Sequence, residues 1–237
     1  MIFDQSEYNV RCEWGEQGVT LLAPISDVVI IVDVLSFSTA VEIATNQGAV
    51  VFPYRWKDKT AYDYADSVEA EVADKNNVNN YSLSPTSLLK LSSDVRLVLP
   101  SPNGSTLSLL SGSVSTIVGC LRNCRAVAFS AMSKGRNIAV IPAGERWEDG
   151  TLRPCLEDLL GAGAIISYLR GTPSPEAIAA GSAFKSASED IYNRLQGCSS
   201  GKEKLYRAEE TDIKLAAELN VSNCIPILRN GAFVKEA

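Results

Sequence analysis

The sequence predicts an α/β fold, with a mainly parallel sheet of repeated β–α units covered by helices on both faces and a short C-terminal hairpin. Three observations support this prediction. Residues 28–32 are an unbroken run of β-branched side chains, which is typical of a parallel strand buried on both faces. Four strand-like segments are each followed by a helical pattern. Hydrophobic residues make up 46% of the chain and charged residues 21%, as expected for a globular protein with a large core.

The first half of the chain predicts three strands and two helices. Apolar and polar side chains alternate near the N-terminus, as in a half-buried strand. Thr39 and Glu42 have the spacing of a capping box, which favours a helix that begins there and ends before Gly48. A second helical pattern follows Trp56, and the polar stretch 75–87 predicts a loop. The expected strands are 8–14, 28–32 and 49–52, and the expected helices are 40–47 and 58–74.

The second half predicts three further β–α units and a tail. Ser174, Pro175 and Glu176 suit the N-cap and first turn of a helix. Asn230 and Gly231 suit the two-residue turn of a hairpin. The expected strands are 96–99, 116–118 and 137–141, the expected helices are 106–110, 124–133, 154–169, 209–219 and one from 174, and the hairpin covers 227–234. We expect a single unit over residues 1–237; the alternative is two lobes that divide near 75–87.

Composition restricts the classes of function. The chain contains no His, which excludes mechanisms that need imidazole and His-ligated zinc sites. The net charge of −6 disfavours nucleic acid and membranes as partners and leaves small molecules. None of the six Cys residues forms a C-x-x-C pair, and no apolar run approaches the length of a membrane span, so we expect a cytoplasmic protein with reduced thiols. A homo-oligomer is left open.

Polar side chains follow the most buried expected strand. In open α/β sheets, ligands bind beyond the carboxyl ends of the strands, where loops lead into helix N-termini. Asp33 ends the strand, and Ser36, Ser38 and Thr39 follow at a helix start. This pattern suits a metal ion beside an anion, with Asp33 as ligand or nucleophile. A turn acid followed by helix-capping hydroxyls fits the same residues equally well.

Two further loops occupy the same kind of position. Asn103 and Gly104 belong to a Pro-Asn-Gly-Ser turn whose backbone donors could face a ligand, although a simple β-turn with a helix cap fits too. Arg122 and Asn123 begin a helix after a strand, where an arginine can bind an oxyanion in bidentate fashion. A solvated arginine would give the same pattern.

The densest group of charges lies around the loop after the last expected strand. Arg146 and Arg153 lie in this loop, and Glu157 and Asp158 fall in the first turn of the next helix, where the helix dipole also favours acids. Adjacent acids with nearby arginines suit a hard cation together with an acidic ligand. We therefore expect these two acids and Asp33 as catalytic residues and metal ligands. The expected substrate-binding residues are Ser36, Ser38, Thr39, Asn103, Gly104, Arg122, Asn123, Arg146 and Arg153.

Five short motifs occur in order along the chain. They are D-V-L-S-F-S-T at 33–39, L-S-P at 83–85, P-N-G-S at 102–105, G-C-L-R-N-C at 119–124, and A-G at 143–144 with E-D-L-L-G-A-G at 157–163. In these motifs the chain resembles the 2-phosphosulfolactate phosphatase family, a magnesium-dependent group of α/β enzymes. It departs from the family at Ser36, where the family has arginine, in the absence of a central glycine-rich segment, and in a longer final loop.

The resemblance implies Mg²⁺-dependent hydrolysis of the phosphate monoester of a small acidic hydroxy acid, as in the conversion of 2-phosphosulfolactate to sulfolactate and phosphate. Arginines would hold the phosphoryl oxygens, and Arg146 or Arg153 would replace the charge lost at Ser36. Direct water attack and a phosphoaspartyl intermediate fit equally well. Two other classes stay open, a non-catalytic binder of small anionic metabolites and a Mg²⁺-dependent lyase or isomerase.

Overall fold

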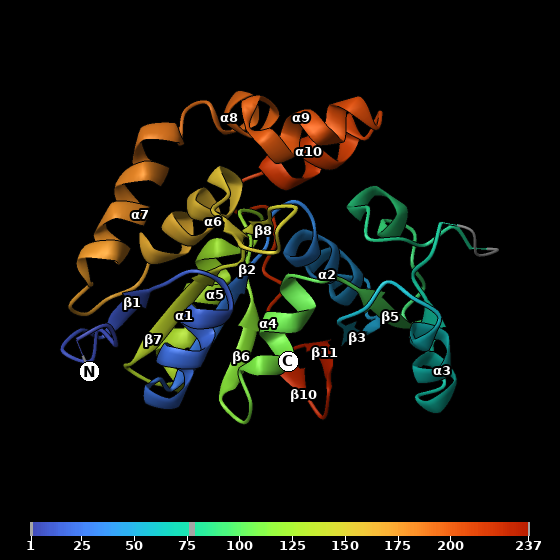
Figure 1. Cartoon of the computed structure of the whole chain (residues 1–237), viewed down its shortest axis with the longest axis horizontal. Coiled ribbons are helices and arrows are strands. Elements are labelled where there is room, and N and C mark those ends of the chain that lie inside the picture. The colour runs from blue at the N-terminus through green and yellow to red at the C-terminus, as the bar shows by residue number, and fades with distance from the viewer. Residues whose placement is uncertain (1, 76–78, 237) are drawn as a thin grey trace.

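The structure, a computed structural model, describes residues 2–75 and 79–236. One nine-stranded mixed sheet runs through the molecule in the order β1-β7-β2-β6-β10-β11-β3-β5-β4, and helices cover both of its faces (Figure 1). A separate two-stranded hairpin, β8 with β9, lies in the loop after β7. The predicted α/β class with a mainly parallel sheet is confirmed.

The bounds of the elements are as follows. The strands are β1 Val10–Cys12, β2 Val28–Val32, β3 Val50–Tyr54, β4 Glu71–Val72, β5 Arg96–Pro100, β6 Ser115–Val118, β7 Ile138–Pro142, β8 Glu145–Arg146, β9 Leu152–Arg153, β10 Pro226–Arg229 and β11 Ala232–Lys235. The helices are α1 Gly15–Leu22, α2 Phe37–Asn46, α3 Thr60–Ser67, α4 Gly104–Leu110, α5 Cys124–Lys134, α6 Leu156–Ile166, α7 Pro175–Ala187, α8 Ile191–Gly197, α9 Ser199–Tyr206 and α10 Glu210–Ala217.

Strand β2 lies in the middle of the core. Its five side chains are fully buried. Val28, Ile30 and Val32 pack with the apolar side chains of α5, α6 and α7, whereas Val29 and Ile31 pack with those of α1, α2 and α4. Successive side chains of a strand point to opposite faces, so this β-branched run requires helices on both sides of the sheet.

The C-terminal hairpin joins two groups of parallel strands. Strands β1, β7, β2 and β6 form one group, and β3, β5 and β4 form the other. Strands β10 and β11 lie between them and pair antiparallel with β6 and β3. Asn230 and Gly231 have φ of 52° and 82°, which suits the predicted two-residue turn. The hairpin is therefore an internal part of the sheet, with Phe233 fully buried.

Sheet twist brings the carboxyl ends of the two groups together. Three antiparallel pairings separate the groups, so in a flat sheet β5 would run opposite to β2. Adjacent strands rotate by roughly 20 to 25°, which over the five steps from β2 to β5 amounts to roughly 100 to 125°. The loop after β5 consequently reaches the loop after β2, where the Gly104 N–H donates to Asp33 Oδ2 at 3.1 Å.

The start of α2 differs from the prediction. The helix begins at Phe37, three residues before the expected start, and the capping box is absent. The Thr39 hydroxyl instead donates to the Val34 carbonyl at 2.8 Å. Glu42 is buried and pairs with Arg122. The predicted capping box is wrong because the Thr39 hydroxyl bonds to a backbone carbonyl of the preceding loop and Glu42 pairs with Arg122.

Two other regions also depart from the sequence pattern. The helix expected over 58–74 ends at Ser67, because the chain turns at Glu69 with φ of 51° and Val72 then joins β4. The loop expected over 75–87 includes 76–78, which lie outside the described residues, and ends in a 3-10 helix at Pro85–Leu88. Helices α1, α8 and α9 had no counterpart in the prediction. Within the described part of the chain, no helix combines the length and apolar character needed to cross a bilayer.

Candidate active site

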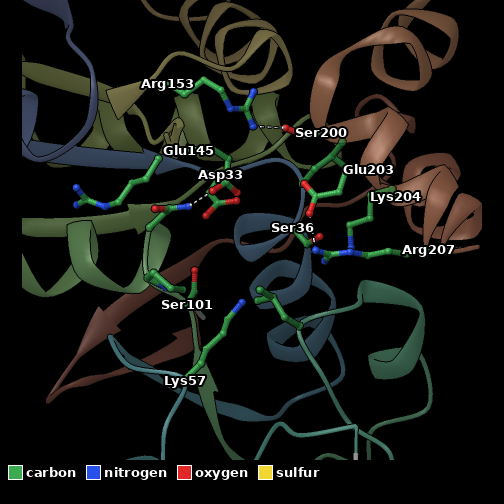
Figure 2. A pocket seen from close by; sticks show the side chains of 15 residues that line it. Asp33, Ser36, Lys57, Ser101, Glu145, Arg153, Ser200, Glu203, Lys204 and Arg207 are labelled. Atoms are coloured by element: carbon green, nitrogen blue, oxygen red, sulfur yellow. Dashed lines mark hydrogen bonds and ion pairs between the residues drawn. The ribbon is translucent and has the colours of Figure 1, made fainter. Parts of the chain in front are cut away.

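A pocket of about 550 Å³, here called the Asp33 pocket, lies where the loops after β2, β3, β5 and β7 meet. The hairpin β8–β9 and helix α9 complete its walls. Figure 2 shows Asp33 between Arg153 and Lys57, with the side chains of α9 to one side. The lining residues are Asp33, Leu35, Ser36, Lys57, Leu83, Ser101, Pro102, Asn103, Glu145, Arg146, Arg153, Ser200, Glu203, Lys204 and Arg207.

Backbone donors fix the Asp33 carboxylate in the pocket. The N–H groups of Phe37 and Gly104 donate to its two oxygens, each at 3.1 Å. A Cβ atom at position 104 would lie 2.2 Å from Phe37 Cδ1, so the close approach of this backbone requires glycine. Burial, and after it the charge of Glu145, raises the pKa of Asp33 to about 7 despite these hydrogen bonds. Asp33 therefore favours a bound proton or cation near neutral pH.

Asp158 connects the loops after β2 and β7. Its two carboxylate oxygens accept hydrogen bonds from the N–H groups of Val34 and Gly144, both at 2.8 Å. Burial raises the pKa of Asp158 well above its ordinary value, and the charges of Asp33 and Glu157 act in the same direction. Glu157 and Asp158 are 2% and 3% exposed and do not line the pocket. The structure places these two acids behind Asp33, and their role as metal ligands stays a prediction.

Glu145 is a pocket acid that the sequence analysis did not select, although it follows β7 at the carboxyl edge. The Asn103 amide donates to Glu145 Oε2 at 2.8 Å. Together with Asp33, Glu157 and Asp158, this residue forms what we call the carboxylate cluster. Among the described residues, no Lys or Arg forms an ion pair with any of the four. Such a group of acids favours a bound cation.

The two predicted loop arginines both line the pocket, but they differ in whether an acidic side chain pairs with them. Arg146 forms an ion pair with Glu16. Arg153 has no acidic partner among the described residues. Its guanidinium donates to Ser200 Oγ at 3.3 Å and lies 5.7 Å from the centre of the Trp147 ring. Arg153 is therefore the arginine whose charge is available to an anion.

Helix α9 supplies pocket residues that the sequence analysis missed. Ser200, Glu203 and Lys204 of α9, and Arg207 directly after it, line one wall of the pocket (Figure 2). Their separations of three and four residues are those of a single helix face, which is the one signal in the sequence. The segment has little apolar periodicity, so the usual indicator of a helix is weak here.

The α9 cations already have acidic partners. Lys204 Nζ lies 2.9 Å from Glu209 and 3.1 Å from Asp212, and Arg207 pairs with Glu203. Asp212 is 1% exposed and also accepts hydrogen bonds from Ser84 and Thr86, so it connects α9, α10 and the 82–88 segment. The ion pairs therefore nearly neutralise this wall of the pocket and hold its side chains in place.

The predicted hydroxyl residues divide into two groups. Ser36 lines the pocket. The Ser38 hydroxyl donates to the Ile31 carbonyl at 3.3 Å and accepts from the Asp33 N–H at 2.8 Å, and Thr39 donates to the Val34 carbonyl. Ser38 and Thr39 are fully buried, so they stabilise the loop that carries Asp33 and do not line the pocket.

Of the remaining predicted residues, Asn103 lines the pocket and the Gly104 N–H holds Asp33, whereas Arg122 and Asn123 lie away from it. Arg122 Nε lies 2.6 Å from Glu42, and its guanidinium also pairs with Glu218. The Asn123 side chain accepts from the Cys120 N–H and donates to the Cys224 carbonyl. Both side chains have partners within the fold.

The pocket acids fit a partial ligand set for a hard cation. Among the residues that the structure describes, no three His, Cys, Asp or Glu side chains form a ready metal site. Mg²⁺, however, commonly binds through one or two carboxylates and completes its coordination with water and substrate phosphate. Asp33 and Glu145 line the pocket and have no basic partner in the described part of the chain, so their oxygens suit this mode.

Comparison with known proteins identifies a family. The model of the family described as 2-phosphosulpholactate phosphatase matches residues 19–231. The matched range includes every residue that lines the Asp33 pocket, α9 included. No curated protein matches the chain.

Proposed function

The chain belongs to the 2-phosphosulpholactate phosphatase family, a family of phosphoric monoester hydrolases, and from this premise we propose that it is a Mg²⁺-dependent phosphatase for a small acidic hydroxy acid. The hydrolase class follows from the family. The cation, the residues and the substrate are our proposal, with 2-phosphosulpholactate as the first candidate substrate.

One observation supports this proposal above all others. Asp33 lies in the pocket with both carboxylate oxygens held by backbone N–H groups, in a cluster of four acids that have no Lys or Arg partner among the described residues. Burying such charge costs free energy unless a proton or cation compensates it. A phosphatase uses this arrangement because the cation that balances the acids also binds the phosphoryl group.

Each residue has a defined task in the proposed reaction. Asp33 and Glu145 would hold Mg²⁺, which supplies neutralisation of phosphoryl charge and a more acidic bound water. Asn103 orients Glu145 through their 2.8 Å hydrogen bond. Arg153 binds phosphoryl oxygens, since its charge is free and Ser200 and Trp147 fix its guanidinium. Asp33 serves as ligand or as nucleophile, and trapping with hydroxylamine or ¹⁸O-labelled water distinguishes the two roles.

The remaining features support a small metabolite as the partner. The net charge is −6, and five basic side chains nevertheless line the pocket. This local concentration of cations suits an acidic small molecule better than nucleic acid or a membrane surface. All six Cys residues are unpaired and buried, which supports the cytoplasm as the proposed compartment.

Release of phosphate from a panel of phosphorylated hydroxy acids, with and without Mg²⁺, tests the proposal. We expect release that depends on Mg²⁺ and is greatest for substrates with an additional acidic group. Tight binding of these acids without phosphate release would indicate a non-catalytic binder. Consumption of substrate without phosphate release would indicate a lyase or isomerase.

A further inference from the structure

Two basic residues in the Asp33 pocket have no acidic partner among the described residues. They are Arg153 and Lys57, whereas Arg146, Lys204 and Arg207 all form ion pairs. Figure 2 shows Arg153 and Lys57 on opposite sides of Asp33, with the ammonium group of Lys57 pointing into the pocket. The pocket therefore presents two separate uncompensated positive charges.

These two cations come from different groups of strands. Arg153 ends β9 and precedes α6, the helix that carries Glu157 and Asp158. Lys57 lies in the loop after β3, where the Ser101 N–H donates to the Tyr54 carbonyl at 2.9 Å and joins the ends of β3 and β5. One free charge thus lies beside the carboxylate cluster and the other on the far side of the pocket.

We propose that Lys57 is a specificity-determining residue that binds a second anionic group of the substrate, a carboxylate or a sulfonate, while Arg153 binds the phosphoryl group. This inference rests on the proposed phosphatase function and names the residue that recognises the second acidic group of the substrate. It concerns a loop lysine outside every motif that the sequence analysis selected.

Size and charge both favour this assignment. A water molecule occupies about 30 Å³, so a pocket of about 550 Å³ has room for a phosphoryl group and further groups. In the proposed site, the cation on Asp33 and Glu145 and the charge of Arg153 are taken by the phosphoryl group, so a second anion needs a separate positive charge. On the Lys57 side it meets a positive charge that no carboxylate of the described residues already compensates.

Substitution of Lys57 by Ala, with Lys59→Ala as a matched control, tests the inference. Lys59 lies two residues further along the same loop and lines only a neighbouring cavity, so its loss changes the net charge equally without altering the Asp33 pocket. Each variant is assayed with a 2-phosphorylated hydroxy acid and with para-nitrophenyl phosphate, which has no second acidic group.

For Lys57→Ala we expect kcat/KM to fall about 10-fold or more for the hydroxy acid, mainly through KM, and to change less than about twofold for the aryl phosphate. Lys57→Arg should restore most of the loss because it restores the charge. Lys59→Ala should behave as the parent. Equal losses with both substrates, or no loss with either, would overturn the inference.

A binding measurement separates this inference from the proposed function. Sulfolactate has a carboxylate and a sulfonate but no phosphoryl group, so calorimetry can test Lys57 without catalysis. We expect the parent and Lys59→Ala to bind sulfolactate and Lys57→Ala to bind it at least about fivefold more weakly. Equal binding by all three, or none by the parent, would overturn the role of Lys57. Absence of phosphate release with normal sulfolactate binding would instead contradict the phosphatase proposal alone.

Discussion

The loops after the neighbouring strands β2 and β6 carry two buried groups of charge that are built in opposite ways. After β2, Asp33 belongs to a cluster of acids without a basic partner among the described residues. After β6, Arg122 lies between Glu42 at 2.6 Å and Glu218, and also donates to the Leu215 carbonyl. The second group connects the β6 loop to α2 and α10 and gives the fully buried Glu42 a basic partner.

This difference distinguishes a functional site from an ion pair that stabilises the fold. A buried ion pair is held by its own partners, and it costs stability chiefly when one partner is removed. Unpaired buried acids cost stability as they stand, and such groups with shifted pKa values are concentrated at functional sites. We therefore infer a catalytic role for the loop after β2 and a structural role for the loop after β6.

Of the changes that test this difference, removal of divalent cations should have the largest effect on activity. EDTA should abolish phosphate release, because the carboxylate cluster would lose the charge that balances it, and added Mg²⁺ should restore activity. The Arg122 group has its own counter-charges and should need no cation. Full phosphatase activity in protein shown to be metal-free by elemental analysis would contradict the mechanism.

Asp33→Asn should give the next largest effect. The substitution keeps the volume and removes the charge, so kcat should fall by at least about 10²-fold in a folded protein. Glu218→Gln is the matched control, since it removes one acid from the Arg122 group, and its activity should remain within about twofold of the parent. Unchanged kcat/KM in Asp33→Asn would show that Asp33 has a purely structural role.

Removing Arg122 should reverse the pattern, with a large effect on stability and little on turnover. Arg122→Met leaves Glu42, which is fully buried, without its cation, and this should lower the free energy of unfolding by about 3 to 5 kcal/mol. Urea denaturation measures the loss. The double variant Glu42→Leu/Arg122→Met should recover most of it. If the stable fraction of Arg122→Met lost activity with every substrate, Arg122 would belong to the site after all.

Arg153→Ala should reduce kcat/KM by about 10- to 150-fold with all phosphate esters, since a lost contact to a charged group costs about 1.5 to 3 kcal/mol. Arg146→Ala is the comparison, and its effect should be smaller because Arg146 already pairs with Glu16. Steady-state kinetics with aryl and hydroxy-acid substrates checks both. Equal effects of the two variants would show that the ion pair with Glu16 opens in the complex.

The sequence predicted the two loops equally well and could not distinguish them. Both have a buried strand, then polar residues, then a helix, which was enough to predict the β–α units and to select Asp33 and Arg122. What decides their roles is the contact between Arg122 and Glu42, which are 80 residues apart. Local patterns do not encode such a partner. Helix α9 was missed for a related reason, because tertiary ion pairs stabilise its polar face more than an apolar stripe does.

The smallest expected effect is a pH dependence of stability that belongs to the carboxylate cluster. In metal-free protein, the pKa of Asp33 is raised to about 7 from an ordinary value of 3.8. Between these values the folded protein holds a proton that the unfolded chain has lost, so the free energy of unfolding should fall as the pH rises from 5 to 7. The chain has no His, and acids with lowered pKa, such as Glu209 and Glu236, titrate below this range.

Thermal unfolding in EDTA at pH 5 and pH 7 measures this slope. We expect Tm to be lower at pH 7 by at least about 3 °C, because about 1 kcal/mol shifts Tm by about 2 to 4 °C in a chain of this size. Asp33→Asn should reduce the slope, since it removes one of the two acids of the cluster whose pKa is raised, and saturating Mg²⁺ should reduce it by replacing the proton with a cation. Glu218→Gln should keep the slope of the parent, because it leaves the carboxylate cluster unchanged. A Tm that rises from pH 5 to pH 7 in the metal-free parent would mean that these acids are compensated in the folded protein, and the contrast between the two loops would then disappear.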